Sequence, residues 1–227
     1  MHDCFLFNIS TKTIAKACFN NLEIALTTPY SAYAYAVEHH MSSFEQGESI
    51  IATCKKYSYL YAIHILKDRF PLGEPVIITD AYQTYMYARL LKIKFPEGEP
   101  ILATHPSYAY GYAHYVLDNR FLLGESVIAT NAESSYWYAK NVLESRFIEG
   151  EAAIATDPYF SYEYAKYVLE SRFELGEPAI AKNLFCAKKY THEVLMKDFY
   201  IDGDLICEYN IKNSKWYDFD NCTKVLL

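Results

Sequence analysis

Apolar and polar residues follow a repeat of about 26 residues along this chain, and the unit is written seven times. Residues 158–181, PYFSYEYAKYVLESRFELGEPAIA, show it clearly. Counted from Tyr162, positions one, four, eight and twelve fall within about 80° on a helical wheel, and positions three and seven widen this apolar face. The polar residues lie mostly on the opposite side. The pattern therefore predicts a long helix with a broad buried face, because a strand would alternate with period two.

Two markers keep the same period, so the repeat is not a coincidence of composition. The glycines are separated by 26, 25, 26, 26, 26 and 27 residues: Gly47, Gly73, Gly98, Gly124, Gly150, Gly176 and Gly203. The Tyr-Ala pairs begin at Tyr35, Tyr61, Tyr87, Tyr112, Tyr138 and Tyr164, and the seventh copy has Tyr190 followed by Thr191.

Residues with clear local preferences mark the ends of each predicted helix. Asp157-Pro158 places an N-cap carboxylate before a proline at the first helical position. Thr28-Pro29 and His105-Pro106 copy this position, and the cap without proline is supplied by Asp80, Asn131 and Asn183. The glycine three residues after each phenylalanine is expected to be the left-handed residue that ends the long helix. After it, segments such as residues 74–78 predict a second, very short α or 3₁₀ helix.

The third repeat is one residue short between Ala88 and Phe95. The missing residue falls in the long helix, so we expect a kink or a π-to-α register change there.

These features predict an all-α fold, a right-handed α-solenoid of about seven two-helix repeats in a single domain. The repeats span residues 29–210. Residues 1–28 predict an N-terminal cap or half repeat, with Asn21 in the left-handed glycine position. Residues 211–227 break the period and predict a C-terminal cap.

Composition excludes some classes of function. The net charge is −7 and no run of Lys or Arg exceeds two, which disfavours nucleic-acid binding. No stretch of about 18 apolar residues predicts a membrane span, and the N-terminus lacks the pattern of a signal peptide. The six cysteines have neither CxxC spacing nor the period of the repeat. They predict buried, reduced thiols in a cytoplasmic protein, with no metal site.

The repeated tyrosines form two ladders, at positions one and three of the repeat. They could form a stacking platform for bases or other aromatic ligands. The alternative is that they pack inside the repeat array and direct their hydroxyls to a backbone group or the surface. Both ladders belong to the apolar face, which favours packing.

The repeat also carries an arginine before its phenylalanine and a glutamate after its glycine. An ion pair within one repeat or between neighbours is the favoured interpretation. The alternative is that the arginines contact a phosphate-bearing ligand: Arg69, Arg120, Arg146 and Arg172.

Large apolar side chains at outward positions of the long helix predict a binding surface. By helical phase these positions face away from the core, and they hold Leu60, Met86, Tyr115, Trp137 and Tyr167. Exposed apolar patches mark interaction sites. The alternative, equally open, is that this face packs on the short helices or on the C-terminal segment.

No catalytic constellation accompanies the repeat. None of the seven histidines lies in HExxH or beside a nucleophile motif, and neither GxGxxG nor GxxxxGK[ST] occurs. The sequence therefore predicts a non-enzymatic protein without a cofactor.

The unit YAYxYAxxVLxxRFxxGExxIATDP resembles the short tandem helical repeats of uncharacterised bacteriophage proteins, over about residues 29–210. The resemblance implies a phage protein acting in the cytoplasm of a bacterial host, and it implies no activity or site. From it and the outward residues we expect a scaffold that binds and inhibits a host defence protein. The alternative is a sponge for a small nucleotide signal, which would suppress host antiviral signalling.

Overall fold

The computed structural model describes residues 21–209, which are mostly helical. Contacts divide the chain into two compact units, Met1–Leu102 and Ala103–Leu227. The boundary falls between the third and fourth repeats, at a place that the sequence pattern did not mark. None of the helices in residues 21–209 combines the length and the apolar character that crossing a membrane requires.

The first unit contains three repeats, each with a long and a short helix, preceded by one additional turn. A π-helical turn, Ala62–Leu66, continues α5, and a 3₁₀ turn, Pro96–Gly98, precedes α8. The helices of this unit are α2 (Leu22–Ala25), α3 (Pro29–Glu38), α4 (Glu45–Ile51), α5 (Lys55–Tyr61), α6 (Glu74–Ile77), α7 (Ala81–Leu91) and α8 (Glu99–Leu102).

The second unit contains the remaining four repeats. Its helices and strands are α9 (Pro106–Tyr112), α10 (Leu122–Ile128), α11 (Ala132–Tyr138), α12 (Glu151–Ile154), α13 (Pro158–Tyr164), α14 (Glu177–Ala181), α15 (Leu184–Tyr190), β1 (Phe199–Ile201) and β2 (Asp204–Cys207). The π turns that continue its long helices are Ala113–Leu117, Ala139–Leu143, Ala165–Leu169 and Thr191–Leu195. The 3₁₀ turns that precede α12 and α14 are Ile148–Gly150 and Glu174–Gly176.

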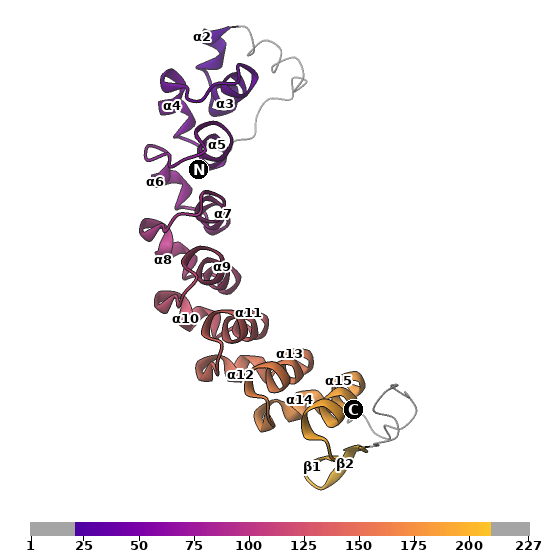
Figure 1. Cartoon of the computed structure of the whole chain (residues 1–227). Coiled ribbons are helices and arrows are strands. Elements are labelled where there is room, and N and C mark those ends of the chain that lie inside the picture. Colours follow the sequence, from indigo (N-terminus) through magenta and orange to yellow (C-terminus); the bar gives the residue numbers. More distant parts are fainter. Residues whose placement is uncertain (1–20, 210–227) are drawn as a thin grey trace. The chain divides into compact units, whose positions relative to one another are not determined.

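Within each unit the long helices form one layer and the short helices another (Figure 1). In the second unit, α9, α11, α13 and α15 lie side by side, and α10, α12 and α14 pack against them. Each long helix of this unit contacts its neighbouring long helix and a short helix. The predicted all-α repeat solenoid is therefore confirmed as a fold class, whereas its handedness stays a prediction.

The predicted N-caps begin the long helices. Asp157 accepts hydrogen bonds from the backbone N–H groups of Tyr159 and Phe160, at 2.8 and 2.9 Å. Thr28 forms a capping box with Ser31. Asp80, Asn131 and Asn183 cap α7, α11 and α15 in the same way, through a side-chain oxygen that accepts from a backbone N–H. His105 stands at the N-cap position of α9, but its side chain makes no capping hydrogen bond.

In most of the long helices a π turn accommodates one additional residue. The long helix of the third repeat has no π turn. In the second repeat the π turn ends at Leu66 and is followed by Lys67 with φ 54°. In the third repeat α7 remains α-helical to Leu91, and Lys92 takes the left-handed conformation. The predicted π-to-α register change is therefore confirmed. The step from the left-handed residue to Phe70 or Phe95 is three residues in both repeats, so the missing residue comes from the helix.

The prediction that glycine ends the long helix in a left-handed conformation was wrong. Gly73, Gly150 and Gly176 have φ of −92°, −89° and −87°. The left-handed residues stand three or four positions before the phenylalanines and are not glycines: His40, Lys67, Lys92, Asp118, Glu144, Glu170 and Met196. The glycines of the first six repeats are required for space instead. A Cβ on Gly150 would lie 2.5 Å from the Phe147 ring and 2.7 Å from Ser135 Cβ of the long helix.

The seventh repeat ends in a β-hairpin in place of a short helix. β1 and β2 pair antiparallel, and Asp202 and Gly203 between them have φ of 51° and 89°. An Asp-Gly pair with positive φ at both positions is typical of a tight hairpin turn. The hairpin keeps Phe199 buried against Tyr190, with ring centroids 5.3 Å apart.

The ends of the chain are described only in part. Asn21 caps α2 from an extended conformation with φ −135°, so the left-handed role predicted for it was wrong. The rest of the predicted N-terminal cap, residues 1–20, and the predicted C-terminal cap, residues 211–227, lie outside the described residues.

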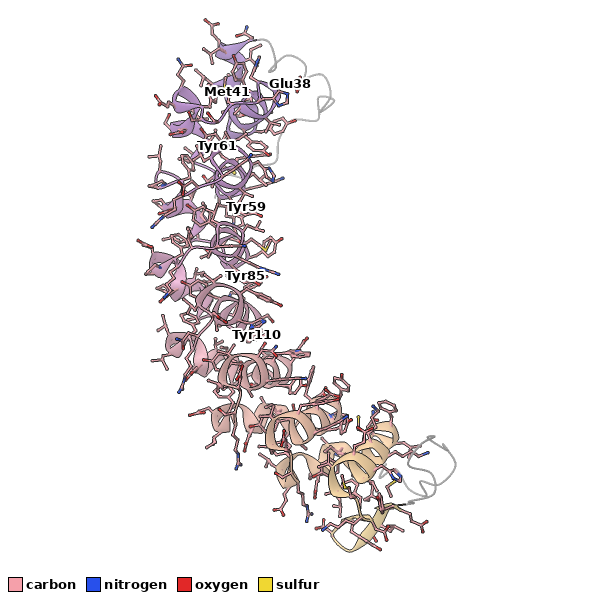
Figure 2. The ribbon with its side chains drawn as sticks, viewed as in Figure 1. Glu38, Met41, Tyr59, Tyr61, Tyr85 and Tyr110 are labelled. Carbon is pink, nitrogen blue, oxygen red and sulfur yellow. The ribbon has the colours of Figure 1, made fainter. Side chains whose placement is uncertain are left out.

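Tyrosine and phenylalanine rings make the core of both units. The side chains with the largest fully buried volume are Tyr61, Phe70, Tyr87, Phe95, Tyr112, Tyr136, Tyr138, Phe147, Tyr162, Tyr164, Tyr190 and Phe199. Within a repeat, the position-three tyrosine meets the phenylalanine edge to face, as Tyr138 and Phe147 do at 5.2 Å. Figure 2 shows the first ladder at Tyr59 and Tyr85, on the neighbouring helices α5 and α7 of the first unit. Packing is therefore confirmed as the role of most ladder tyrosines.

Replacing Gly150 by alanine tests the steric role of the glycine. We expect Gly150→Ala to lower the free energy of unfolding by about 1–3 kcal/mol, since Phe147 or the long helix must move to admit the methyl group. Chemical denaturation measures the change. Glu149→Ala, at the exposed preceding position, is the control and should change stability by less than about 0.5 kcal/mol. A Gly150→Ala protein as stable as the wild type would contradict the steric explanation.

Candidate functional site

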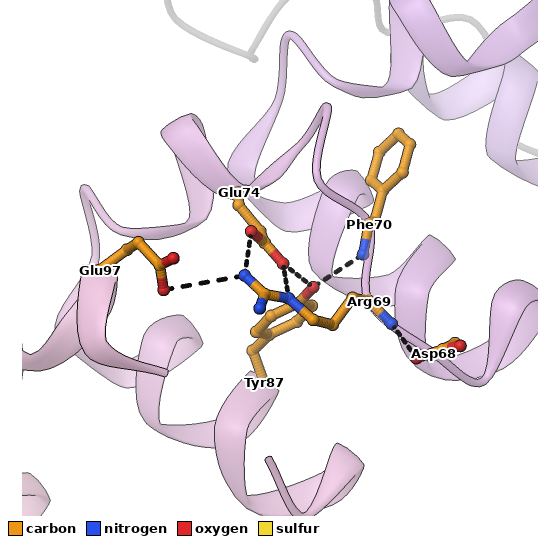
Figure 3. A network of polar contacts seen from close by, with 6 residues as sticks. All are labelled: Asp68, Arg69, Phe70, Glu74, Tyr87 and Glu97. Atoms are coloured by element: carbon orange, nitrogen blue, oxygen red, sulfur yellow. Dashed lines mark hydrogen bonds and ion pairs between the residues drawn. The ribbon is translucent and has the colours of Figure 1, made fainter. Parts of the chain in front are cut away.

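A tyrosine hydroxyl joins consecutive repeats within each unit. Tyr87 on α7 donates a hydrogen bond of 2.7 Å to Glu74 Oε1 at the start of α6. The same hydroxyl accepts a 2.7 Å bond from the backbone N–H of Phe70 (Figure 3). Arg69 chelates the Glu74 carboxylate through Nε and Nη2, both at 2.7 Å. Four groups from two consecutive repeats therefore satisfy one another in one network, which is buried at the tyrosine and half-exposed at the arginine.

The same network recurs at a constant spacing. Each hydroxyl accepts from a phenylalanine N–H 17 residues earlier and donates to a carboxylate 13 residues earlier. In the second unit the Tyr164 hydroxyl oxygen lies 3.0 Å from the backbone N of Phe147 and 2.9 Å from Glu151 Oε1. Both bonds are seen, for example, at Tyr61, Tyr87, Tyr138, Tyr164 and Tyr190.

The predicted Arg–Glu ion pair is confirmed and lies within one repeat. Two N–H···O bonds join each pair: Arg69–Glu74, Arg120–Glu125, Arg146–Glu151 and Arg172–Glu177. Sequence reasoning found this pair but missed the tyrosine, although the fixed distance from Glu to Tyr was a usable signal. The role of these arginines as ligand contacts stays a prediction, since a ligand phosphate would compete with a chelating carboxylate.

The network shifts the ionisation of its members. The Arg120 guanidinium, helped by the Tyr138 hydroxyl, holds the pKa of Glu125 below its usual value, against the opposing effect of burial. Burial would raise the pKa of Glu74, but the hydrogen bonds from Arg69 and Tyr87 outweigh it and lower the pKa. Burial and the neighbouring carboxylate raise the pKa of Tyr87, so its hydroxyl remains a donor.

The outward positions predicted to bind differ in exposure. Leu60 and Met86 in the first unit, and Trp137 in the second, are half-buried. Tyr115 and Tyr167, both in the second unit, are 51% and 46% exposed. The structure brings Trp137 and Tyr167 together around a residue that the sequence analysis did not select, Lys140.

Aromatic rings and lysines alternate across α11, α13 and α15 of the second unit. Lys140 Nζ lies 4.3 Å from the centre of the Tyr167 ring, and Lys166 Nζ lies 4.5 Å from the same ring. One repeat further, Lys189 Nζ lies 5.2 Å from Phe185. These distances fall in the range of cation–π contacts. We name this region the aromatic–lysine surface, and it consists of Trp137, Lys140, Tyr159, Lys166, Tyr167, Phe185 and Lys189.

The sequence analysis missed most of the aromatic–lysine surface because it treated outward positions as separate residues. Lys140 and Lys166 occupy position five of the repeat, which was classed as polar. Tyr159 and Phe185 lie in the first turn of α13 and α15 and are 47% and 48% exposed. Their signal is an aromatic residue two places after the N-cap in consecutive repeats.

A second set of exposed apolar residues lies at the start of the short helices and was also missed. In the second unit Leu122 is 71% exposed and Ile148 is 69% exposed. Leu72 of the first unit and Leu123 and Leu175 of the second share this environment. These positions lie in the opposite layer to the aromatic–lysine surface.

The first unit contains a cleft of about 540 Å³ beside the ends of α3 and α5. Tyr33, His40, Met41 and His64 are among its lining residues, and the Tyr33 hydroxyl lies 2.7 Å from His64 Nδ1. Among the described residues no group of three or more His, Cys, Asp or Glu side chains is arranged to hold a metal ion. The thiols of Cys54, Cys186 and Cys207 are buried, and burial raises the pKa of Cys186 to about 11.

No protein-family model, curated protein or solved structure matches this chain.

Removing one bridging hydroxyl should weaken the contact between repeats. We expect Tyr164→Phe to lower the free energy of unfolding by about 1–3 kcal/mol, because the buried N–H of Phe147 loses its acceptor and Glu151 loses a donor. Urea denaturation at neutral pH measures the change. Tyr159→Phe, which removes a hydroxyl from an exposed ring, should have little effect. Equal effects of the two substitutions would show that the bridge does not stabilise the array.

The lowered pKa of Glu125 predicts a particular pH dependence. The folded chain holds this carboxylate ionised more strongly than the unfolded chain, so its contribution to stability is present above the ordinary pKa of about 4.3. The contribution is lost as pH falls through the lower folded value. We therefore expect Glu125→Gln to reduce stability at pH 7, and the difference from the wild type to shrink below about pH 4. Stability curves that stay parallel from about pH 7 to about pH 3 would contradict the assignment.

Proposed function

We propose that this chain is a non-catalytic repeat scaffold that binds a protein partner through the aromatic–lysine surface. The observation that carries the proposal is the exposure of three aromatic side chains: Tyr159 on α13, Tyr167 on the π turn that continues α13, and Phe185 on the neighbouring helix α15. Trp137 on α11 extends the same surface through its contact with Lys140. Large aromatic side chains with a polar or charged edge are the residues that most often dominate binding energy at protein interfaces.

The scaffold supports this role because it holds these rings in place. The aromatic residues stand on helices whose inner faces are fixed by buried tyrosines such as Tyr138 and Tyr164. Each of these tyrosines is bonded to the preceding repeat. A surface that is already ordered before binding loses less conformational entropy when a partner docks.

The identity of the partner is a further proposal. The resemblance of the repeat to those of bacteriophage proteins suggests a host protein, and we propose that binding inhibits a defence protein in the bacterial cytoplasm. This part of the proposal depends on the resemblance of the repeat alone.

The alternative function, capture of a small nucleotide signal, has weaker support. It would use Arg69, Arg120, Arg146 or Arg172 for the phosphates, and each is chelated by a glutamate of its own repeat. Thermal denaturation with cyclic nucleotides tests it directly, because a ligand that binds only the folded chain raises the apparent melting temperature.

Substitutions on the aromatic–lysine surface test the proposed function. The wild-type chain, Tyr167→Ala and Trp137→Ala are immobilised and exposed to a bacterial lysate, and the retained proteins are quantified by mass spectrometry. We expect one protein to be retained by the wild type and reduced at least about tenfold by either substitution, as at interface hot spots. Binding of that protein, once purified, is then measured with the same three chains.

The control is Leu122→Ala, which truncates a side chain that is 71% exposed on α10, in the layer of short helices. It should retain the partner like the wild type. A partner lost with Leu122→Ala but kept with Tyr167→Ala would place the interface in the other layer. If no retained protein depends on either surface and a cyclic nucleotide raises the melting temperature, the alternative function is favoured.

A further inference from the structure

Two lysines at the same position of consecutive repeats have different partners. Lys166 donates a hydrogen bond of 2.7 Å to Glu193 Oε2 on the next long helix. Lys140, one repeat earlier, meets Tyr167 where the later repeat has Glu193. The exchange of a carboxylate for an aromatic ring leaves Lys140 without an ion pair among the residues that the structure describes.

Three aromatic rings hold the Lys140 ammonium in a fixed position. Its Nζ lies 4.3 Å from the centre of the Tyr167 ring, and 5.4 Å from those of Tyr136 and Trp137. It donates a 3.0 Å hydrogen bond to the Tyr136 hydroxyl, which in turn donates to Glu163 at 3.1 Å. Glu163 is thus linked to the ammonium through the Tyr136 hydroxyl. An ammonium group has three donors, and the hydroxyl of Tyr136 accepts from one of them.

We infer that Lys140 is the anchor point of the aromatic–lysine surface and binds a carboxylate of an acidic segment of the partner protein, with Trp137 and Tyr167 contacting an apolar side chain beside that carboxylate. The inference rests on the proposed function and adds the chemistry of the partner. A half-buried cation surrounded by rings binds an anion more strongly than a cation in water does, because fewer water molecules screen the pair.

The pattern of charge favours an acidic protein segment over a polyanion. A nucleic acid needs a row of unpaired cations along its phosphates. Here the next lysine, Lys166, is already paired with Glu193, and Lys189 lies 3.9 Å from the same carboxylate. A cation surrounded by aromatic rings is suited to a single carboxylate with apolar neighbours.

Fluorescence of Trp137 provides the test. The chain has two tryptophans, so Trp216→Phe leaves Trp137 as the only one, next to the proposed anchor. The probes are short peptides with Asp beside Leu or Phe, the same peptides with Asn in place of Asp, and ATP as a phosphate-bearing probe. Each probe is titrated into the Trp216→Phe chain and into the same chain carrying Lys140→Gln, Lys140→Arg or Lys182→Gln, and circular dichroism checks that the variants are folded. Lys182, the control position, is exposed at the end of α14 in the layer of short helices.

We expect the Asp peptides to change the emission of Trp137, and the Asn peptides to bind about tenfold or more weakly. Lys140→Gln should weaken binding of the Asp peptides to a similar extent, Lys140→Arg should preserve most of it, and Lys182→Gln should change it by less than about threefold. Binding should also weaken as salt rises from about 50 to about 500 mM, because ions screen the pair.

Three results would overturn the inference: equal binding of Asp and Asn peptides, equal effects of Lys140→Gln and Lys182→Gln, or a response to ATP without a response to any peptide. These results are separate from failure of the proposed function. A partner that depends on Tyr167 and Trp137 but is retained by Lys140→Gln would leave the binding scaffold standing and remove the acidic anchor.

Discussion

In both units, the hydrogen bonds of a buried tyrosine hydroxyl join each repeat to the one before it. The position-three tyrosine accepts from the N–H of a phenylalanine in the preceding repeat and donates to a carboxylate beside it. A phenylalanine ring in its place would bury as much apolar surface but would leave an N–H and a carboxylate without a partner. The carboxylate is itself held by an arginine of its own repeat, and this ion pair positions the acceptor that the tyrosine hydroxyl needs. The stability of the array therefore depends on a polar network inside an aromatic core.

The buried contacts between the tyrosine, the phenylalanine and the long helix also explain two features of the backbone, the glycine and the π turn. The glycine allows the short helix to approach the long helix and the phenylalanine ring, as at Gly150, Ser135 and Phe147. The π turn admits one more residue into the long helix while the tyrosine and the phenylalanine keep their buried places. The third repeat keeps both rings with a shorter, wholly α-helical segment, which shows that the contacts and not the helix type are maintained.

The candidate binding surface arises where the repeats differ. Tyr167 and Glu193 occupy the same position in consecutive repeats, and so do Trp137 and Glu163. These two differences give Lys140 three aromatic neighbours where Lys166 has an ion pair with Glu193. Each repeat of the array offers one set of outward positions on its long helix. Variation at the outward positions can therefore create a specific surface without disturbing the buried network, because the two sets lie on different sides of the long helix.

Much of the fold follows from the sequence alone, because the buried contacts are local and recur with the period of the repeat. Helix positions, the caps at Thr28, Asp80 and Asp157, the Arg–Glu pair and the irregular third repeat could all be derived from spacing. Three features could not. The hairpin turn at Gly203 escaped prediction because this glycine keeps nearly the same spacing as the glycines that begin short helices.

The other two features depend on which residues meet in space. The steric role of Gly150 depends on how closely two helices approach. Lys140 became a candidate only when its neighbours were known, since its environment combines Trp137 of its own repeat with Tyr167 of the next. The period of the sequence thus determines which residues are buried, whereas contacts between consecutive repeats determine which exposed residues act together.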